Sequence, residues 1–112
     1  PQADPEQLER VMEDLLAKQV TLDPTFAVYE ANRDLERARH MPWLATYAHP
    51  ALLAFFEPHP RNHASFHWEW TAVDEARWKE HYRHWMRFVR EYGRRGGRIT
   101  VGSDAGFMYQ LY

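Results

Sequence analysis

The residues best suited to chemistry lie in a short turn near the end of the sequence. Residues 98–102 (RITVG) are predicted to form a short buried strand, and residues 103–106 (SDAG) follow as a tight turn. Gly102 and Gly106 on either side of Asp104 allow the backbone to approach a ligand closely. A carboxylate held there can bind a divalent cation or accept a proton from an attacking water molecule. The same pattern also suits a structural Asx turn, and the local sequence favours neither interpretation.

A second candidate group follows an upstream segment that is rich in β-branched and aromatic residues. Residues 19–29 are expected to form a strand and its loop, because Pro24 removes a ladder donor and ends the strand. Thr25 and Tyr29 lie in that loop and are candidates for substrate binding by position. One histidine of the long segment beyond, His59, His63 or His67, is expected to contact the substrate, and His63 is the candidate chosen.

The elements that must position these groups alternate between helix and strand. In order they are a helix over residues 1–18, a strand and its loop over 19–29, a long irregular and partly helical insertion over 30–73, a helix over 74–93, and a strand with its turn over 98–106. This alternation favours parallel strand pairing through crossover connections. Since two parallel strands alone leave both sheet faces uncovered, residues 1–112 are expected to be an excerpt of one α/β domain.

Two of these segments resemble motifs of the amidohydrolase superfamily. Residues 99–106 (ITVGSDAG) resemble its strand-eight motif, and residues 22–29 (LDPTFAVY) are similar to the strand-seven segment of its imidazolonepropionase-like branch. That branch carries a Pro-Thr pair where this sequence has Pro24 and Thr25. The resemblance implies a partial (β/α)8 TIM barrel, of which this chain carries approximately the last two strands.

The resemblance also implies a chemistry. The family holds one or two divalent metal ions, usually zinc, and hydrolyses C–N bonds in amides, cyclic amides or dipeptides with a metal-activated water. Of the family's metal ligands only the strand-eight aspartate has a counterpart here, Asp104, which the resemblance makes both metal ligand and catalytic residue. No His-x-His pair occurs in the sequence, so the other ligands are expected outside these residues.

Composition limits the expected partners. A net charge of -2 provides no basic surface for nucleic acid. No membrane span is visible, and the absence of cysteine excludes disulfides and thiolate metal sites. The expected partners are therefore an amide or dipeptide substrate and the remaining barrel segments of the parent protein. The cellular compartment is left open.

A different class of function remains open at this stage. The chain could be a small non-enzymatic α/β or helical domain that binds a partner through its aromatic-rich loop. It could also be one piece of a nicked enzyme that other chains complete.

The enzyme hypothesis makes a prediction about the isolated chain. Residues 1–112 purified alone with zinc should not hydrolyse amides or dipeptides, because only one ligand of the implied metal centre is present. An assay of product amine release tests this expectation, and measurable turnover by the isolated chain would contradict it.

Overall fold

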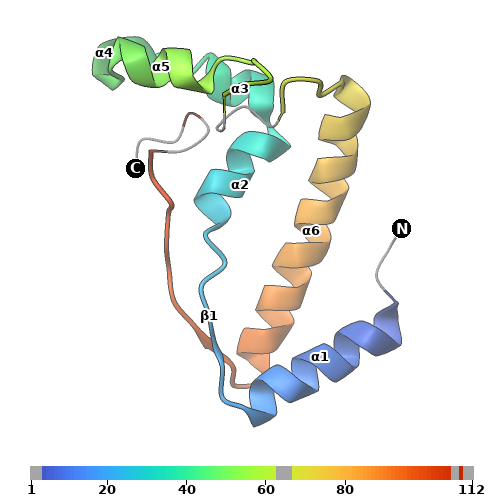
Figure 1. The fold of residues 1–112 in the computed structure, drawn as a ribbon. Coiled ribbons are helices and arrows are strands. Elements are labelled where there is room, and N and C mark those ends of the chain that lie inside the picture. Colours follow the sequence, from blue (N-terminus) through green and yellow to red (C-terminus); the bar gives the residue numbers. More distant parts are fainter. Residues whose placement is uncertain (1–3, 63–66, 107–108, 110–112) are drawn as a thin grey trace. The chain divides into compact units, whose positions relative to one another are not determined.

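The computed structural model of the chain describes residues 4–62, 67–106 and 109. These residues contain two strands of two residues each and several helices (Figure 1). The elements are α1 (Pro5–Ala17), β1 (Thr21–Leu22), α2 (Phe26–Arg33), α3 (Leu35–Arg39), α4 (Leu44–Tyr47), α5 (Pro50–Phe56), α6 (Ala72–Arg94) and β2 (Arg98–Ile99).

The chain divides into two compact units, both of which include part of α6. Unit 1 consists of Pro1–Pro24 and His84–Val101, and unit 2 consists of Thr25–Arg83 and Gly102–Tyr112. Unit 1 therefore holds α1 and both strands, and unit 2 holds α2 to α5.

In unit 1, local signals set both ends of α1. The Asp4 side chain accepts a hydrogen bond from the backbone N–H of Glu6, and Pro5 occupies the first turn. At the other end, the N–H groups of Gln19 and Val20 donate to the carbonyls of Leu16 and Leu15. This pattern is a Schellman motif, and it places Gln19 at φ 52°. Glycine usually takes this position, so Gln19 is held there by its surroundings.

The end of α6 repeats the same motif immediately before β2. The N–H groups of Gly96 and Gly97 donate to the carbonyls of Gly93 and Tyr92, and Gly96 has φ 89°. A Cβ atom at Gly97 would lie 2.2 Å from Cε1 of the Tyr92 ring. Only glycine fits there, because any side chain would collide with the ring.

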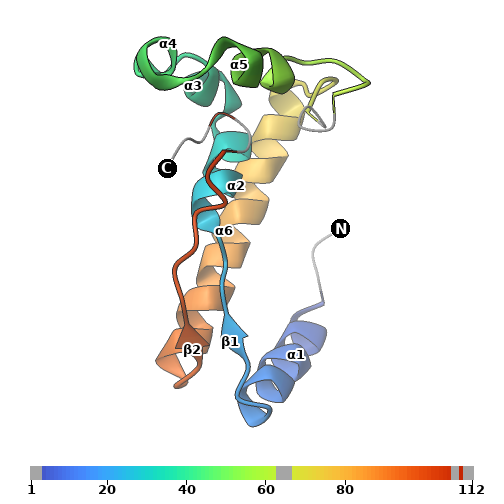
Figure 2. The same ribbon diagram turned by 60° about the vertical axis from the view of Figure 1, so that its left-hand side comes forward.

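The two strands pair in parallel, with Thr21 opposite Arg98 and Leu22 opposite Ile99 (Figure 2). The N–H of Thr100 extends the pairing by donating to the carbonyl of Leu22 at 2.9 Å. Each strand thus begins directly after a helix cap, and the caps fix which residues face each other.

Tyr92 joins the two caps of unit 1. Its side chain is completely buried, and its hydroxyl donates to the carbonyl of Val20 at 2.6 Å. Met12 of α1 and Val89 of α6 are also buried in this unit. This part-buried hydrogen bond holds the Tyr92 ring next to the residue that precedes β1.

Unit 2 is built around an apolar cluster from α2 to α5 and Tyr109. Its buried members are Val28, Ala31, Leu35, Ala38, Leu44, Phe56 and Tyr109. The first part of α6 is attached to α2 by polar side chains. Trp78 Nε1–H donates to the carbonyl of Tyr29 at 3.3 Å, and the Tyr82 hydroxyl donates to that of Phe26 at 3.2 Å.

The expected α/β fold, a partial TIM barrel, is wrong. The part of the chain that the structure describes is 60% helix and 4% strand. The upstream strand stops at Leu22, because Pro24 cannot donate to a ladder and α2 begins at Phe26. The downstream strand stops at Ile99, where its partner ends. It is also not buried, since Ile99 is 41% and Val101 99% exposed.

None of the described helices is long and apolar enough to cross a bilayer. Even α6, with 23 residues, carries charged side chains in its first and last turns.

The junction around Tyr92 gives a stability prediction. Tyr92→Phe should lower the free energy of unfolding by about 0.5–1.5 kcal/mol, because the part-buried hydrogen bond to the Val20 carbonyl is lost. Urea denaturation measures the loss. Tyr47→Phe is the matched control, because Tyr47 is 78% exposed and should change stability little. Equal midpoints for Tyr92→Phe and the wild type would contradict this role.

Candidate functional site

Asp104 lies in an exposed turn with a left-handed backbone. Its φ is 50°, which is uncommon for a residue other than glycine. The neighbouring residue Ser103, and not Asp104, makes the side-chain hydrogen bond in this turn: its Oγ accepts from the Ala105 N–H at 3.3 Å. Within the described residues the Asp104 carboxylate makes no hydrogen bond or ion pair. In the described residues the Asp104 side chain therefore does not form the Asx turn that the sequence left open.

The other predicted site residues lie in different surroundings. Thr25 is half-buried at φ 41°, immediately before α2, and its side chain makes no capping hydrogen bond. Tyr29 lies within α2, where its ring packs against Trp78 at 6.1 Å and against the apolar cluster of unit 2. Its position is that of a packing residue. His63 lies outside the described residues.

The described residues alone do not build a metal site. Across residues 4–62, 67–106 and 109, no group of three or more His, Asp or Glu side chains could hold a metal ion. A zinc ion takes three or four protein ligands, so the described residues do not fit the implied metal by themselves. Of the ligands that the resemblance implies, they hold one, Asp104.

Unit 1 contains a hollow of about 270 Å³ beside the two helix caps. The arginine side chains that line the hollow already have hydrogen-bond partners. Arg95 contacts the carboxylates of Glu9 and Glu91, and Arg98 Nη2 donates to the carbonyl of Gln19. Hydrogen bonds from Arg94 and Arg95 lower the pKa of the Glu91 carboxyl to about 2. The arginine side chains that line this hollow therefore connect the two helix caps to each other.

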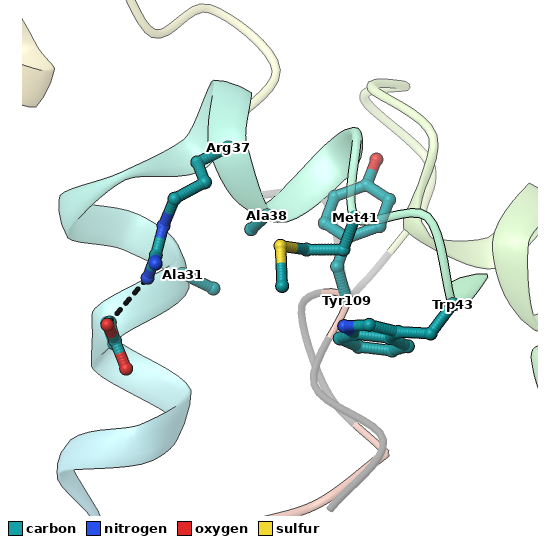
Figure 3. Close-up of a pocket in the computed structure, with 7 residues that line it drawn as sticks. Ala31, Arg37, Ala38, Met41, Trp43 and Tyr109 are labelled. Atoms are coloured by element: carbon teal, nitrogen blue, oxygen red, sulfur yellow. Dashed lines mark hydrogen bonds and ion pairs between the residues drawn. The ribbon is translucent and has the colours of Figure 1, made fainter.

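Unit 2 contains a smaller cavity, of about 140 Å³, with a different lining (Figure 3). Charged side chains of α2 and α3 form one wall, and Met41, Trp43 and Tyr109 lie across from them. Ala31 and Ala38 complete the lining, and both are buried. The cavity thus combines an ion pair with apolar and aromatic side chains.

Next to this cavity, a network of charges connects α2, α3 and α6. Arg33 Nε donates to Asp34 Oδ2 at 2.8 Å, and Lys79 Nζ lies 3.3 Å from Asp34 Oδ1. Burial of the Asp34 carboxyl opposes its ionisation, but the hydrogen bonds from Arg33 and Lys79 outweigh burial and lower its pKa. The Arg33 guanidinium also lies 5.0 Å from the Tyr82 ring centroid.

Sequence reasoning did not find the cavity. It predicted a long irregular and partly helical insertion over residues 30–73 without locating the short helices α3 to α5 within it. A signal was present, because Glu30, Arg33 and Arg37 are spaced three and four residues apart and can share one helical face. Met41, Trp43 and Tyr109 gave no such signal, since only the tertiary fold brings them to the cavity.

Comparisons with family models, with curated proteins and with solved structures give no match to this chain.

The charge network makes the stability of unit 2 depend on pH. The folded-state pKa of Asp34 lies below its ordinary value of 3.8. Its contribution should be complete above about pH 4 and be lost as the pH falls through the folded-state pKa. Asp34→Asn should therefore be less stable than the wild type at pH 7, and the difference should shrink as the pH falls below 3.8 through the lowered pKa of Asp34. Urea denaturation at several pH values measures the difference. A constant difference would show that the ionised carboxylate does not contribute.

Proposed function

We propose that this chain is part of a metal-dependent hydrolase of C–N bonds and that Asp104 is its contribution to the reacting centre. The proposal rests first on the sequence resemblance of residues 22–29 and 99–106 to the amidohydrolase superfamily. The substrate class is an amide, a cyclic amide or a dipeptide.

The observation that carries the proposal is the conformation of the two residues that follow the paired strands. Thr25 comes three residues after Leu22 and Asp104 five residues after Ile99, and both have left-handed backbones at φ 41° and 50°. For threonine this conformation is an outlier. Strained backbones of this kind concentrate at functional sites, where surrounding structure holds a side chain in a required position.

The pairing and the exposure of β2 also support the proposal. Because β1 and β2 are parallel, both motifs continue from the same end of the strand pair. The described residues leave Val101 99% and Ile99 41% exposed. Apolar side chains beside an open sheet edge favour contact with further segments of a larger protein.

In the proposed reaction Asp104 is the general base and then the general acid. Its carboxylate accepts a proton as water attacks the carbonyl carbon of the substrate. It then donates that proton to the leaving nitrogen as the C–N bond breaks. An exposed carboxylate without a structural partner in the described chain is available for both transfers.

A helical interaction domain is the second candidate function. The high helix content favours it, and so do large exposed side chains such as Tyr47 at 78%, Trp68 at 45% and Phe55 at 42%. These side chains would contact a protein partner, and Asp104 would have no role.

Substitution of Asp104 separates the two candidates. In the complete protein that carries this chain, Asp104→Asn should lower kcat for amide or dipeptide hydrolysis by roughly a hundredfold or more, since amide nitrogen and oxygen do not accept the proton. Circular dichroism should be unchanged, because the carboxylate supports no described structural contact.

Asp14→Asn is the matched control. Asp14 is an exposed aspartate that pairs with Lys18 four residues away, and its loss should leave kcat unchanged. Normal turnover by Asp104→Asn, or no turnover by the zinc-loaded wild type on amides, cyclic amides and dipeptides, would overturn the proposed function.

A further inference from the structure

The charged wall of the 140 Å³ cavity in unit 2 presents both signs of charge side by side. Arg37 Nη2 donates to Glu30 Oε1 at 2.6 Å, and Arg33 Nη2 donates to the same oxygen at 2.9 Å. The Arg37 side chain is 58% exposed and that of Glu30 38% exposed. Solvent and a small ligand can therefore reach both groups.

Each partner of this ion pair keeps hydrogen-bonding capacity for a ligand. Both hydrogen bonds to Glu30 use Oε1, so Oε2 accepts none within the described chain. Arg37 uses only Nη2 there, which leaves Nη1 and Nε as donors. The wall thus offers a free carboxylate oxygen next to two free guanidinium donors.

The opposite wall is apolar and polarisable. Met41 and Trp43 lie between α3 and α4, and the buried Tyr109 ring is fixed because its hydroxyl donates to the Phe56 carbonyl at 3.0 Å. In Figure 3 the thioether of Met41 and the rings of Trp43 and Tyr109 lie across the cavity from Arg37. Thioether and aromatic groups pack well against an aliphatic or thioether side chain.

We propose that this cavity binds one free α-amino acid with an apolar side chain, its carboxylate on Arg37 and its ammonium on Glu30. Arg37 would attract a ligand with a single negative charge, but Glu30 would repel it at nearly the same distance. A ligand with a single positive charge would be attracted by Glu30 and repelled by Arg37. A zwitterion satisfies both partners at once. The cavity is also well below the roughly 300–1,000 Å³ of drug-sized pockets, so it suits one residue.

The proposal stands apart from the proposed function. None of the lining residues is Asp104, Thr25 or a residue of either strand. Hydrolytic activity and amino-acid binding can thus be lost separately.

The test is calorimetric titration of the complete protein that carries this chain with L-methionine and three analogues. L-methionine should bind with a Kd of about 1 mM or tighter. N-acetyl-L-methionine lacks the ammonium, L-methioninamide lacks the carboxylate and glycine lacks the side chain, and each should bind at least roughly tenfold more weakly. No binding of L-methionine, or equal binding of the acetylated form, would overturn the proposal.

Variants locate the binding within the chain. Arg37→Gln should weaken L-methionine binding by roughly tenfold or more, because a charge-assisted hydrogen bond is lost. Arg83→Gln is the matched control, because Arg83 is 62% exposed, pairs with Glu80 three residues away and does not line the cavity. Equal weakening by both variants would contradict the assignment. Asp104→Asn should leave binding unchanged, and a loss there would place the ligand at the Asp104 turn instead.

Discussion

Unit 1 depends on the hydrogen bond from the Tyr92 hydroxyl to the Val20 carbonyl. Val20 is the last residue before β1, and Tyr92 lies in the last turn of α6. The bond therefore connects the residue that precedes one strand to the helix that leads into the other. Gly97 makes it possible, because a side chain there would displace the Tyr92 ring. The parallel pairing of β1 and β2 follows, since both strands begin at fixed points relative to this ring.

Local signals predicted the helices better than the strands. Asp4 and Pro5 specify where α1 begins, and the apolar spacing from Trp78 to Tyr92 specifies α6, because capping and helical periodicity act within a few residues of the sequence. The strands depend on contacts between residues far apart in the sequence. The second strand was therefore expected to be longer than it is, and the expected α/β class was wrong.

Residues 26–29 (FAVY) show how tertiary packing overrides composition. Their aromatic and β-branched side chains favour a strand, but the structure places them in the first turn of α2. Helical spacing brings Val28 and Ala31 into the apolar cluster of unit 2, where both are buried. Burial of that face outweighs a propensity difference of less than about 1 kcal/mol per residue.

The candidate sites differ in how far the sequence could predict them. Asp104 was predicted from a short motif, and the structure shows that its backbone is left-handed and that Ser103 accepts the side-chain hydrogen bond of the turn. Tyr29 was chosen by position, yet its ring packs against Trp78. The cavity beside Glu30 and Arg37 requires Tyr109, about 70 residues away in the sequence, and such a distant contact leaves no local pattern.

The two Schellman motifs also limit where residues can be inserted into the chain or deleted from it. One residue inserted or deleted between Gln19 and Thr21, or between Gly96 and Arg98, would shift one strand against the other by one position. Every side chain of that strand would then point to the opposite sheet face. Length variation among proteins built in this way should therefore avoid the two caps. Insertions and deletions are expected instead in exposed connections such as residues 57–61, where an added residue does not change the register of the strands.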